Sequence, residues 1–406
     1  MTIRYTPKRL FSASLLVATL SGLAGPALAL DADDFATKIA AVFSESGAKL
    51  NFASVEADGD AIVLKSTRLE SPGQAPVTVG DVTFNGVEED DDGSYYVEQA
   101  VFEDIDMVEG PTRVTVADME MSGLTIPAEP VLETLGDVLF YEGGSTGEIR
   151  VETDGKQVFS MAGTSFEVNR ADDDSSVGMQ MTGSGMEIDL SQVDDPKATE
   201  ALAELGYTTL TGDIKLDGTW EVEPGTFNLR EYSLTLDDVG RLAMSLQISG
   251  YTIELIKAMQ QAQAAAAANP DPEAAQQAMG LSMLGLLQQL SFHSASIRFD
   301  DASVTEKALA FAGKKQGISG EQMSMAIKGM LPLMLGQLGI PALQQQISAA
   351  ANIYLDNPQN ITISAKPARP VGVPVIMGAG MGDPKSLVDL LNVQVTANDP
   401  VLLCCK

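Results

Sequence analysis

The sequence has few of the side chains on which common catalytic and binding chemistries depend. Among its 406 residues there are one histidine, one tryptophan and two cysteines, and aromatic residues make up 5% of the chain. This leaves little material for imidazole catalysis, for a zinc site or for an aromatic platform that binds sugars. The composition therefore predicts no metal or other cofactor, and it favours a protein that is not an enzyme.

Basic residues and long apolar runs are also scarce. Lysine and arginine number 25 against 56 acidic residues, which gives a formal net charge of −31. A chain of this sign is poorly suited to neutralising phosphates or to adsorbing on anionic lipid. Beyond the N-terminus, no uninterrupted apolar run reaches the roughly 18 residues of a membrane-spanning helix. We expect neither a nucleic-acid partner nor an integral membrane span in the mature chain.

The first 29 residues have the pattern of an export signal. Three basic residues precede a weakly apolar stretch, and the Ala-Leu-Ala sequence at 27–29 supplies the small residues of a cleavage site. We therefore expect cleavage after Ala29 and a periplasmic protein. Retention of this segment as a membrane anchor is the alternative.

The two cysteines, Cys404 and Cys405, are neighbours near the C-terminus. A disulfide between adjacent residues would be strained, and two thiols without further ligands do not form a metal site. We interpret them as incidental thiols of a frayed tail, with an intermolecular disulfide as the alternative.

Apolar residues alternate with polar ones over much of the chain up to residue 250. A short amphipathic helix comes first, with Phe35, Ile39 and Phe43 on one side, and the clearest alternation is at 242–248. Period-two alternation is typical of strands with one buried face, and Gly-rich pairs between such runs predict turns. The predicted turns are Asp58-Gly59, Gly80-Asp81, Asp92-Gly93, Asp154-Gly155, residues 182–185 and Asp217-Gly218.

From residue 251 the apolar spacing becomes helical. The sequence predicts a kink or stop at Pro332, and it predicts a loop with an apolar lip over 372–382. One more helix, at 198–205 after Asp195-Pro196, interrupts the preceding meander. Helices are predicted at 255–269, 279–290, 319–334, 341–354 and 384–391, and strands at 292–299, 361–365 and 393–395.

These patterns predict an α+β fold. We expect a long, curved antiparallel meander sheet with apolar helices packed on it or inserted into it, mainly in the C-terminal third. The expected regions are a signal peptide at 1–29, a β-rich meander at 30–250, and a mixed helical and strand region at 251–406 that continues the sheet.

Two kinds of signal could carry chemistry, and each has a simpler interpretation. Acidic clusters occur at 88–92, 172–174 and 194–195. They are expected in solvated turns, because only the first approaches the spacing of a calcium loop and it lacks the closing glutamate. Ser145 lies in a Gly-Gly-Ser-Thr-Gly sequence that matches a nucleophile elbow, but strand-like residues follow it where an elbow needs a helix. We therefore predict a hairpin turn and a partly buried His293, with a hydrolase that uses both residues as a lesser alternative.

The methionines are more informative, because 18 occur and several gather in apolar helical blocks. Unbranched thioethers adapt to irregular apolar shapes. Ordinary core filling would account for them, and the functional interpretation is a groove that accepts an apolar ligand. The candidate ligand-binding residues are Met179, Met181, Leu246, Met279, Met283, Met323, Met330 and Met334.

Strands punctuated by Asp-Gly turns, the alternating run 241–248 and the strand-plus-helix segment 292–311 resemble AsmA-like and YdgA-like periplasmic proteins. The likeness extends over residues 50–400 and consists of a similar pattern of strands and turns, without a diagnostic motif. It implies long sheets that bend into an apolar trough and, for several members, a part in moving lipids between envelope membranes. AsmA-like proteins usually keep an N-terminal membrane anchor. This chain differs from them if its signal is cleaved as expected. The resemblance brings no catalytic residue with it.

The sequence thus predicts a non-enzymatic periplasmic protein that binds a lipid or other apolar ligand in a groove between sheet and helices, with a role in cell-envelope homeostasis. The alternative is a periplasmic structural or protein-interaction module that recruits an envelope protein through acidic turns or a sheet edge.

Overall fold

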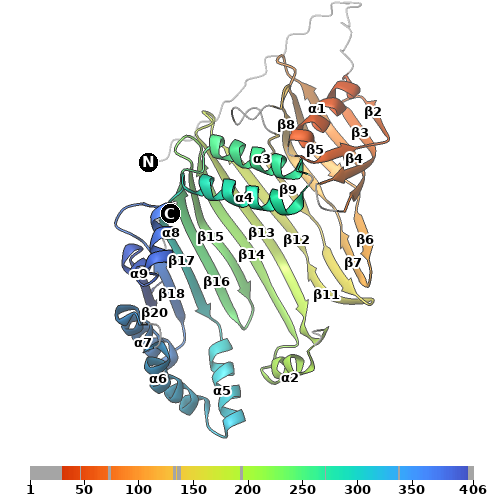
Figure 1. The fold of residues 1–406 in the computed structure, drawn as a ribbon. Coiled ribbons are helices and arrows are strands. Elements are labelled where there is room, and N and C mark those ends of the chain that lie inside the picture. Colours follow the sequence, from red (N-terminus) through yellow and green to blue (C-terminus); the bar gives the residue numbers. More distant parts are fainter. Residues whose placement is uncertain are drawn as a thin grey trace, which may run out of the picture.

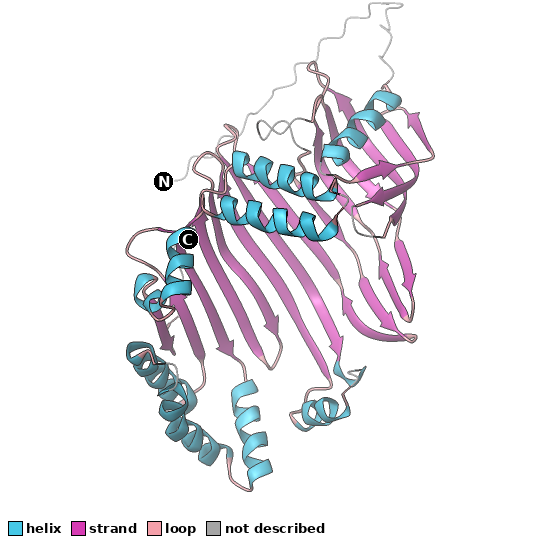
Figure 2. Cartoon of the chain, viewed as in Figure 1, coloured by secondary structure: helices cyan, strands magenta, loops and turns pink. Residues whose placement is uncertain are grey.

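The computed structural model describes residues 30–45, 47–71, 75–130, 134, 139–192, 195–269, 271–336 and 339–400. Over these residues the chain forms one antiparallel sheet of 20 strands together with helices (Figures 1 and 2). The predicted α+β class and meander sheet, with several helices in the C-terminal region, are confirmed. The expected signal peptide and the two cysteines lie outside the described residues.

Most strands pair with their neighbours in the chain, as in a meander. A main path leads from β3 through β4, β5, β8, β9 and β12 to β18 and β20, while β6, β7, β10 and β11 form a side branch that rejoins at β13. The strands are β1 (Lys49–Asn51), β2 (Ser54–Asp58), β3 (Ala61–Glu70), β4 (Val77–Glu89), β5 (Tyr95–Phe102), β6 (Ile105–Glu109), β7 (Thr112–Val116), β8 (Glu120–Ile126), β9 (Gly143–Thr146), β10 (Ile149–Thr153), β11 (Lys156–Met161), β12 (Gly163–Arg170), β13 (Ser176–Asp189), β14 (Thr209–Glu221), β15 (Thr226–Leu236), β16 (Gly240–Ser249), β17 (Ser291–Asp301), β18 (Asn360–Ala365), β19 (Val371–Gly372) and β20 (Val393–Ala397).

Three of the predicted turns are bulges inside continuous strands. The strands β4, β13 and β14 run through Gly80-Asp81, residues 182–185 and Asp217-Gly218, and the pairing register shifts at or opposite each place. Gly80 and Gly185 have positive φ angles of 83° and 62°, which glycine adopts without strain. Turns and bulges both favour glycine, so the local pattern could not distinguish them. The other three predicted turns join consecutive strands, as expected.

Most helices lie where the sequence pattern predicts them, with three corrections. The helix predicted at 279–290 begins earlier, at Pro272, and ends at Leu287. The helix that contains Pro332 continues to Gly336, and residues 373–382 form a helix instead of a loop, with a proline in its first turn. The helices are α1 (Ala32–Glu45), α2 (Pro196–Glu204), α3 (Ile253–Ala267), α4 (Pro272–Leu287), α5 (Val304–Gln316), α6 (Gly320–Gly336), α7 (Pro341–Asp356), α8 (Val373–Gly382) and α9 (Ser386–Leu390). Within the described residues, no helix has both the length and the hydropathy needed to cross a membrane.

Helix α1 covers one face of the sheet near the N-terminus (Figure 1). The ring of Phe35 is fully buried and lies 5.0 Å from that of Phe84 and 5.3 Å from that of Tyr95, both edge to face. These residues belong to a buried apolar cluster, which is drawn from α1, β3, β4, β5 and β8. We call residues 30–126 the N-terminal unit. Its core follows from an amphipathic helix lying on alternating strands.

Candidate ligand-binding trough

Eight neighbouring strands, β12 to β18 and β20, present an apolar face. Residues directly opposite each other on paired strands share a face of the sheet, so the register sets out apolar side chains in rows. The central row is Phe166, Met181, Leu216, Tyr232, Met244, Ile297, Ile363 and Val395. The next row is Val168, Met179, Gly218, Leu229, Leu246, Ala295, Ala365 and Val393. We call these two rows the trough face.

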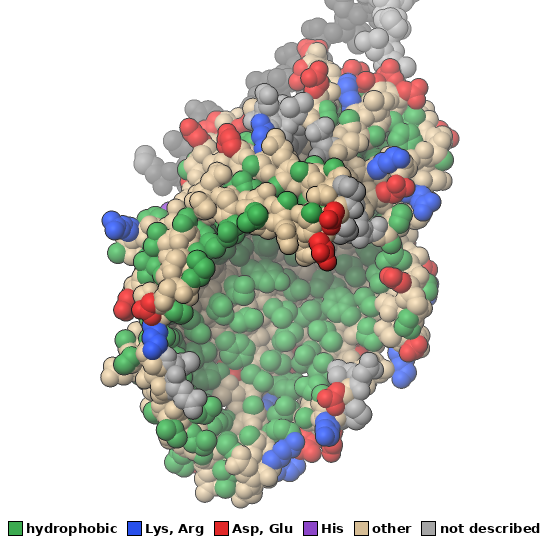
Figure 3. Space-filling view, viewed as in Figure 1, with side chains coloured by type: hydrophobic (Ala, Val, Ile, Leu, Met, Phe, Trp, Pro, Cys, Tyr) green, Lys and Arg blue, Asp and Glu red, His purple; other side chains and the backbone are tan. Residues whose placement is uncertain are grey.

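The trough face is both long and open. With strands about 4.8 Å apart, eight strands span roughly 34 Å. In the central row, the four side chains on β15 to β18 are exposed, from 38% for Met244 to 51% for Ile363, whereas those on β12 to β14 are half-buried and Val395 on β20 is buried. Figure 3 shows the consequence, a hollow lined mainly by hydrophobic side chains. A contiguous exposed apolar surface of this kind is rare on single chains and marks a binding site more often than isolated apolar residues do.

The opposite face of the same strands is polar. One row there is Ser165, Thr182, Lys215, Ser233, Ala243, Arg298, Thr362 and Thr396. Arg241 lies 2.7 Å from Glu231, whose carboxylate also accepts a hydrogen bond from Ser233. Burial acts to raise the pKa of Glu231, but these two hydrogen bonds outweigh it and the pKa is lowered. The charges of this part of the sheet are thus matched on the face away from the trough.

Helices border the hollow and carry exposed apolar side chains of their own. The pair α3–α4 runs across the strands at one end of the hollow, and α5 to α9 lie along the side formed by the last strands (Figure 1). The first pair is anchored where Trp220 Nε1 donates a hydrogen bond of 2.7 Å to the carbonyl oxygen of Tyr251, next to the start of α3. Exposed apolar residues on these helices are Leu281, Leu284, Leu287, Met325, Ile327, Met330, Leu333, Met334, Ile353, Val375 and Met381.

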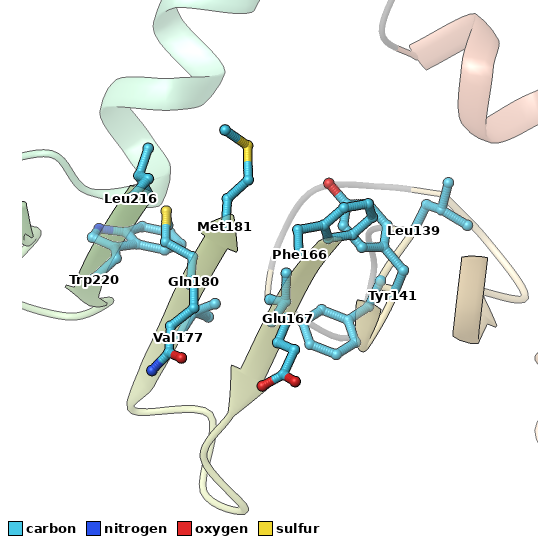
Figure 4. Close-up of a pocket in the computed structure, with 12 residues that line it drawn as sticks. Leu139, Tyr141, Phe166, Glu167, Val177, Gln180, Met181, Leu216 and Trp220 are labelled. Carbon is cyan, nitrogen blue, oxygen red and sulfur yellow. The ribbon is translucent and has the colours of Figure 1, made fainter. Parts of the chain in front are cut away.

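One end of the trough face deepens into a pocket of about 400 Å³. Phe166, Met181 and Leu216 from the central row line it, together with Trp220 and Tyr141. In Figure 4 the apolar side chains of Met181 and Leu216 point to one side of the strands, whereas the polar side chains of Glu167 and Gln180 point to the other. The volume is within the range of small-molecule sites, about 300–1,000 Å³.

The structure separates the eight candidate ligand-binding residues into three groups. Met179, Met181 and Leu246 all lie on the trough face, and the first two also line its pocket. Met330 and Met334 are exposed on α6, at 58% and 63%.

The remaining three candidates are less accessible. Met279 and Met283 are half-buried on α4, and Met323 is buried at 6% exposure near the start of α6. Met323 points away from solvent because α6 packs between α5 and α7. An apolar helix has buried and exposed sides, and the sequence pattern did not distinguish them.

Sequence reasoning did not single out most of the trough face. Phe166, Leu216, Tyr232, Ile297 and Ile363 were absent from the candidates, although all five line up with Met181 and Met244. Their alternation with polar neighbours indicates that they share an apolar face. It does not indicate that this face is open to a ligand, because a strand residue on an apolar face is more often buried than exposed.

The possible hydrolase residues are far apart in the sheet. Ser145 is on β9 and His293 on β17, and the strands β12 to β16 lie between them. The hydroxyl of Ser145 donates a 3.1 Å hydrogen bond to Glu120, and His293 Nε2 shares one of 2.8 Å with Ser249 Oγ. The predicted hairpin turn at Ser145 is therefore wrong, since the residue lies within a strand.

The acidic clusters at 88–92 and 172–174 lie at turns in which carboxylates accept local hydrogen bonds, and Asp194 of the third cluster lies outside the described residues. Asp92 accepts from the hydroxyl and the backbone N–H of Ser94, and these bonds lower its pKa. Asp174 pairs with Arg170, which lowers the pKa of Asp174 despite some burial. Among the described residues, no group of three or more His, Cys, Asp or Glu side chains is arranged to hold a metal ion.

Residues 233–398 match a family model whose description is "Uncharacterized protein". The matched stretch runs from within β15 to the residue after β20, and so contains the last strands of the trough face with the helices α3 to α9. A search of curated proteins finds no match to this chain.

Proposed function

We propose that this protein binds a lipid or another elongated apolar molecule along the trough face, without catalysing a reaction. The observation that carries the proposal is a continuous apolar row across eight strands that is exposed on β15 to β18, with matched charges on the opposite face. Burying such a surface against hydrocarbon gains about 25 cal/mol per Å². A hydrocarbon chain gains this energy without leaving polar groups unpaired.

The dimensions support a lipid as the ligand. A bilayer core about 30 Å thick holds two acyl chains end to end, so one extended chain occupies roughly 15 Å. The roughly 34 Å of the trough face therefore accommodates a full acyl chain and more. Its two rows offer hydrogen bonds only through the hydroxyl of Tyr232 and the backbone, which suits hydrocarbon better than a polar ligand.

We further propose that the protein acts in the periplasm and serves cell-envelope homeostasis. The export-signal pattern of residues 1–29 supports this location, and a lipid carrier is useful where lipids must pass through water between membranes. The resemblance to AsmA-like and YdgA-like proteins points in the same direction.

The first test is native mass spectrometry with lipid extraction on the full-length protein, purified without detergent. We expect co-purified lipid, and saturable binding of the neutral fluorescent probe Nile red. A protein that carries no lipid and does not bind the probe would contradict the proposal. That result would favour the alternative, recruitment of a partner protein, and strongly salt-dependent pull-downs would then support it.

A matched pair of double variants locates the site. Ile297→Glu with Ile363→Glu places two carboxylates on the trough face, on directly paired residues of β17 and β18. Ser296→Glu with Ser364→Glu places the same two charges on the same strands, also directly paired, on the opposite face. We expect at least a tenfold loss of Nile red affinity, or about 1.4 kcal/mol, in the first pair only, because a buried unpaired carboxylate is costly. Equal affinities in the two pairs would place the ligand elsewhere.

A further inference from the structure

A second cavity, of about 340 Å³, lies under helix α1 in the N-terminal unit. Its walls come from α1, β1, β3, β4, β5 and β8, and Leu139 and Tyr141 complete them. Apart from Thr67 and the ring hydroxyl of Tyr141, the described lining side chains are apolar, and none is acidic or basic. The hydroxyl of Thr67 donates to the carbonyl oxygen of Leu64 at 3.3 Å.

A partly open apolar cavity of this size is unusual beside a well-packed core. Several lining residues, among them Leu64 and Phe84, are at most 3% exposed. Protein interiors seldom contain voids larger than a water molecule, because the atoms around a void lose their packing contacts. Apolar cavities of about 150 Å³ stay dry and take up small apolar molecules. The cavity under α1 has more than twice that volume and an apolar lining, and half-buried walls such as Phe43 and Val79 leave it accessible to an apolar occupant.

This cavity adjoins the pocket at the end of the trough face. Leu139 and Tyr141 line both. The ring of Tyr141 packs edge to face on that of Phe166, with 5.4 Å between the ring centres, and Phe166 begins the central row of the trough. In Figure 4, Leu139, Tyr141 and Phe166 lie together beside the pocket. Leu139 and Tyr141 therefore form the wall that the two cavities share.

We propose that the cavity under α1 holds the methyl end of a single unbranched hydrocarbon chain, the rest of which lies in the pocket and along the trough face. This inference rests on the proposed function and specifies its ligand, a lipid with at least one long straight chain. The absence of charged groups from the described lining keeps a polar head group out of the cavity. The head group therefore lies on the trough side, where water reaches it.

Photolabelling of the unaltered protein tests the orientation. Hexadecanol with a diazirine on its terminal carbon is irradiated with the purified full-length protein, and the labelled peptides are identified by mass spectrometry. We expect labels on α1, β3 or β8, near Ile39, Leu64 and Leu124. The same alcohol with its diazirine beside the hydroxyl is expected to label the strands that line the pocket, β12 to β14. Terminal-carbon labels confined to β13–β18 would overturn the inference and leave the proposed function standing.

A matched pair of single variants tests the depth of the site. Val79→Phe fills the cavity from β4, while Val101→Phe adds the same volume on β5 at a residue outside the lining and 39% exposed. Binding of each alcohol is measured by displacement of Nile red. We expect Val79→Phe to lower the affinity for hexadecanol by about tenfold and to change the affinity for the shorter octanol by less than about twofold. Val101→Phe should change neither.

The outcomes distinguish this inference from the function on which it rests. If Val79→Phe lowers the affinity for both alcohols equally, or changes neither affinity, a chain end under α1 is contradicted while binding to the trough remains. Failure of hexadecanol to bind the unaltered protein contradicts both. If Val79→Phe does not fold, the photolabelling result decides alone.

Discussion

The N-terminal unit and the trough belong to one sheet and have the same alternation of apolar and polar residues, yet they differ in what covers the apolar face. Beneath α1, Ile62, Tyr95 and Val97 are completely buried. On the trough face, Ile297 and Ile363 are about half exposed. The comparison shows that alternation determines which side chains share a face, and that another element must lie on this face to bury it.

The helices of the two regions are placed differently. Helix α1 lies flat on its strands and inserts Phe35 among them. Helix α7 instead lies against the last strand, β20, where the amide oxygen of Gln346 accepts a 3.0 Å hydrogen bond from the backbone N–H of Val395. This contact occupies an edge group that could otherwise pair with a further strand. The C-terminal helices thus protect the border of the sheet and leave much of its apolar face open.

The strongest test of this difference replaces one isoleucine in each region with alanine. Ile62 and Ile297 are both strand residues, with exposed fractions of 0% and 49%. Ile62→Ala should lower the free energy of unfolding by about 2–5 kcal/mol, because it removes buried methyl groups and leaves a cavity. Ile297→Ala should cost less than about 1 kcal/mol, because much of its surface is already in water.

Both values are measured by urea unfolding of the purified protein without ligand. The m-value, which scales with the surface exposed on unfolding, serves as the control for an unchanged transition. A cost for Ile297→Ala equal to that for Ile62→Ala would mean that another part of the molecule covers the trough face, and the comparison would fail.

A smaller effect is expected at the contact that holds α1 in place. Asp34 Oδ2 accepts hydrogen bonds from Lys38 at 2.5 Å and from the hydroxyl of Tyr95 at 2.8 Å. The bond from Lys38 lowers the pKa of Asp34 most, burial opposes it, and the bond from Tyr95 adds to the lowering. Asp34→Asn should reduce stability at neutral pH by about 1 kcal/mol.

The pH dependence of this effect has a definite sign. A carboxyl group whose pKa is lower in the folded state stabilises the fold above its unfolded value of about 3.9, and this contribution disappears as the pH falls through the folded value. The difference between Asp34→Asn and the unaltered protein should therefore close below about pH 4. Urea unfolding at several pH values measures it, and a difference that persists in acid would exclude Asp34 ionisation as the cause.

The smallest effect on stability is expected from mild oxidation of methionines, which reports exposure directly. Met244 on the trough face is 38% exposed and Met330 on α6 is 58% exposed, whereas Met161 and Met186 are at most 6% exposed. Peroxide should oxidise the first two well before the others, because it reacts with accessible sulfur. Peptide mass spectrometry follows each site over time. Protection of Met244 in ligand-free protein would contradict an open trough, and its protection by added hexadecanol would support the proposed site.

Local chemistry made several elements predictable. Asp195 caps α2 by accepting hydrogen bonds from the backbone N–H groups of Lys197 and Ala198, as the Asp-Pro pair predicts. Ser319 and Gln322 form the reciprocal bonds of a capping box before α6. Such signals depend on only a few neighbouring residues, so they can be recognised without knowing the tertiary structure.

The sequence by itself determined the α+β class and most helices and strands. It also determined that residues such as Leu246 and Met181 lie on the apolar face of their strands. It did not determine whether Gly185 would turn the chain or bulge within a strand, because both geometries need the same backbone freedom. Nor could it place Phe166 beside Met181 or Ile297 beside Ile363, since pairing between distant strands sets the register. Only the tertiary structure decided that α1 would cover one part of the apolar face while the other stayed open, because burial depends on contacts between elements distant in sequence.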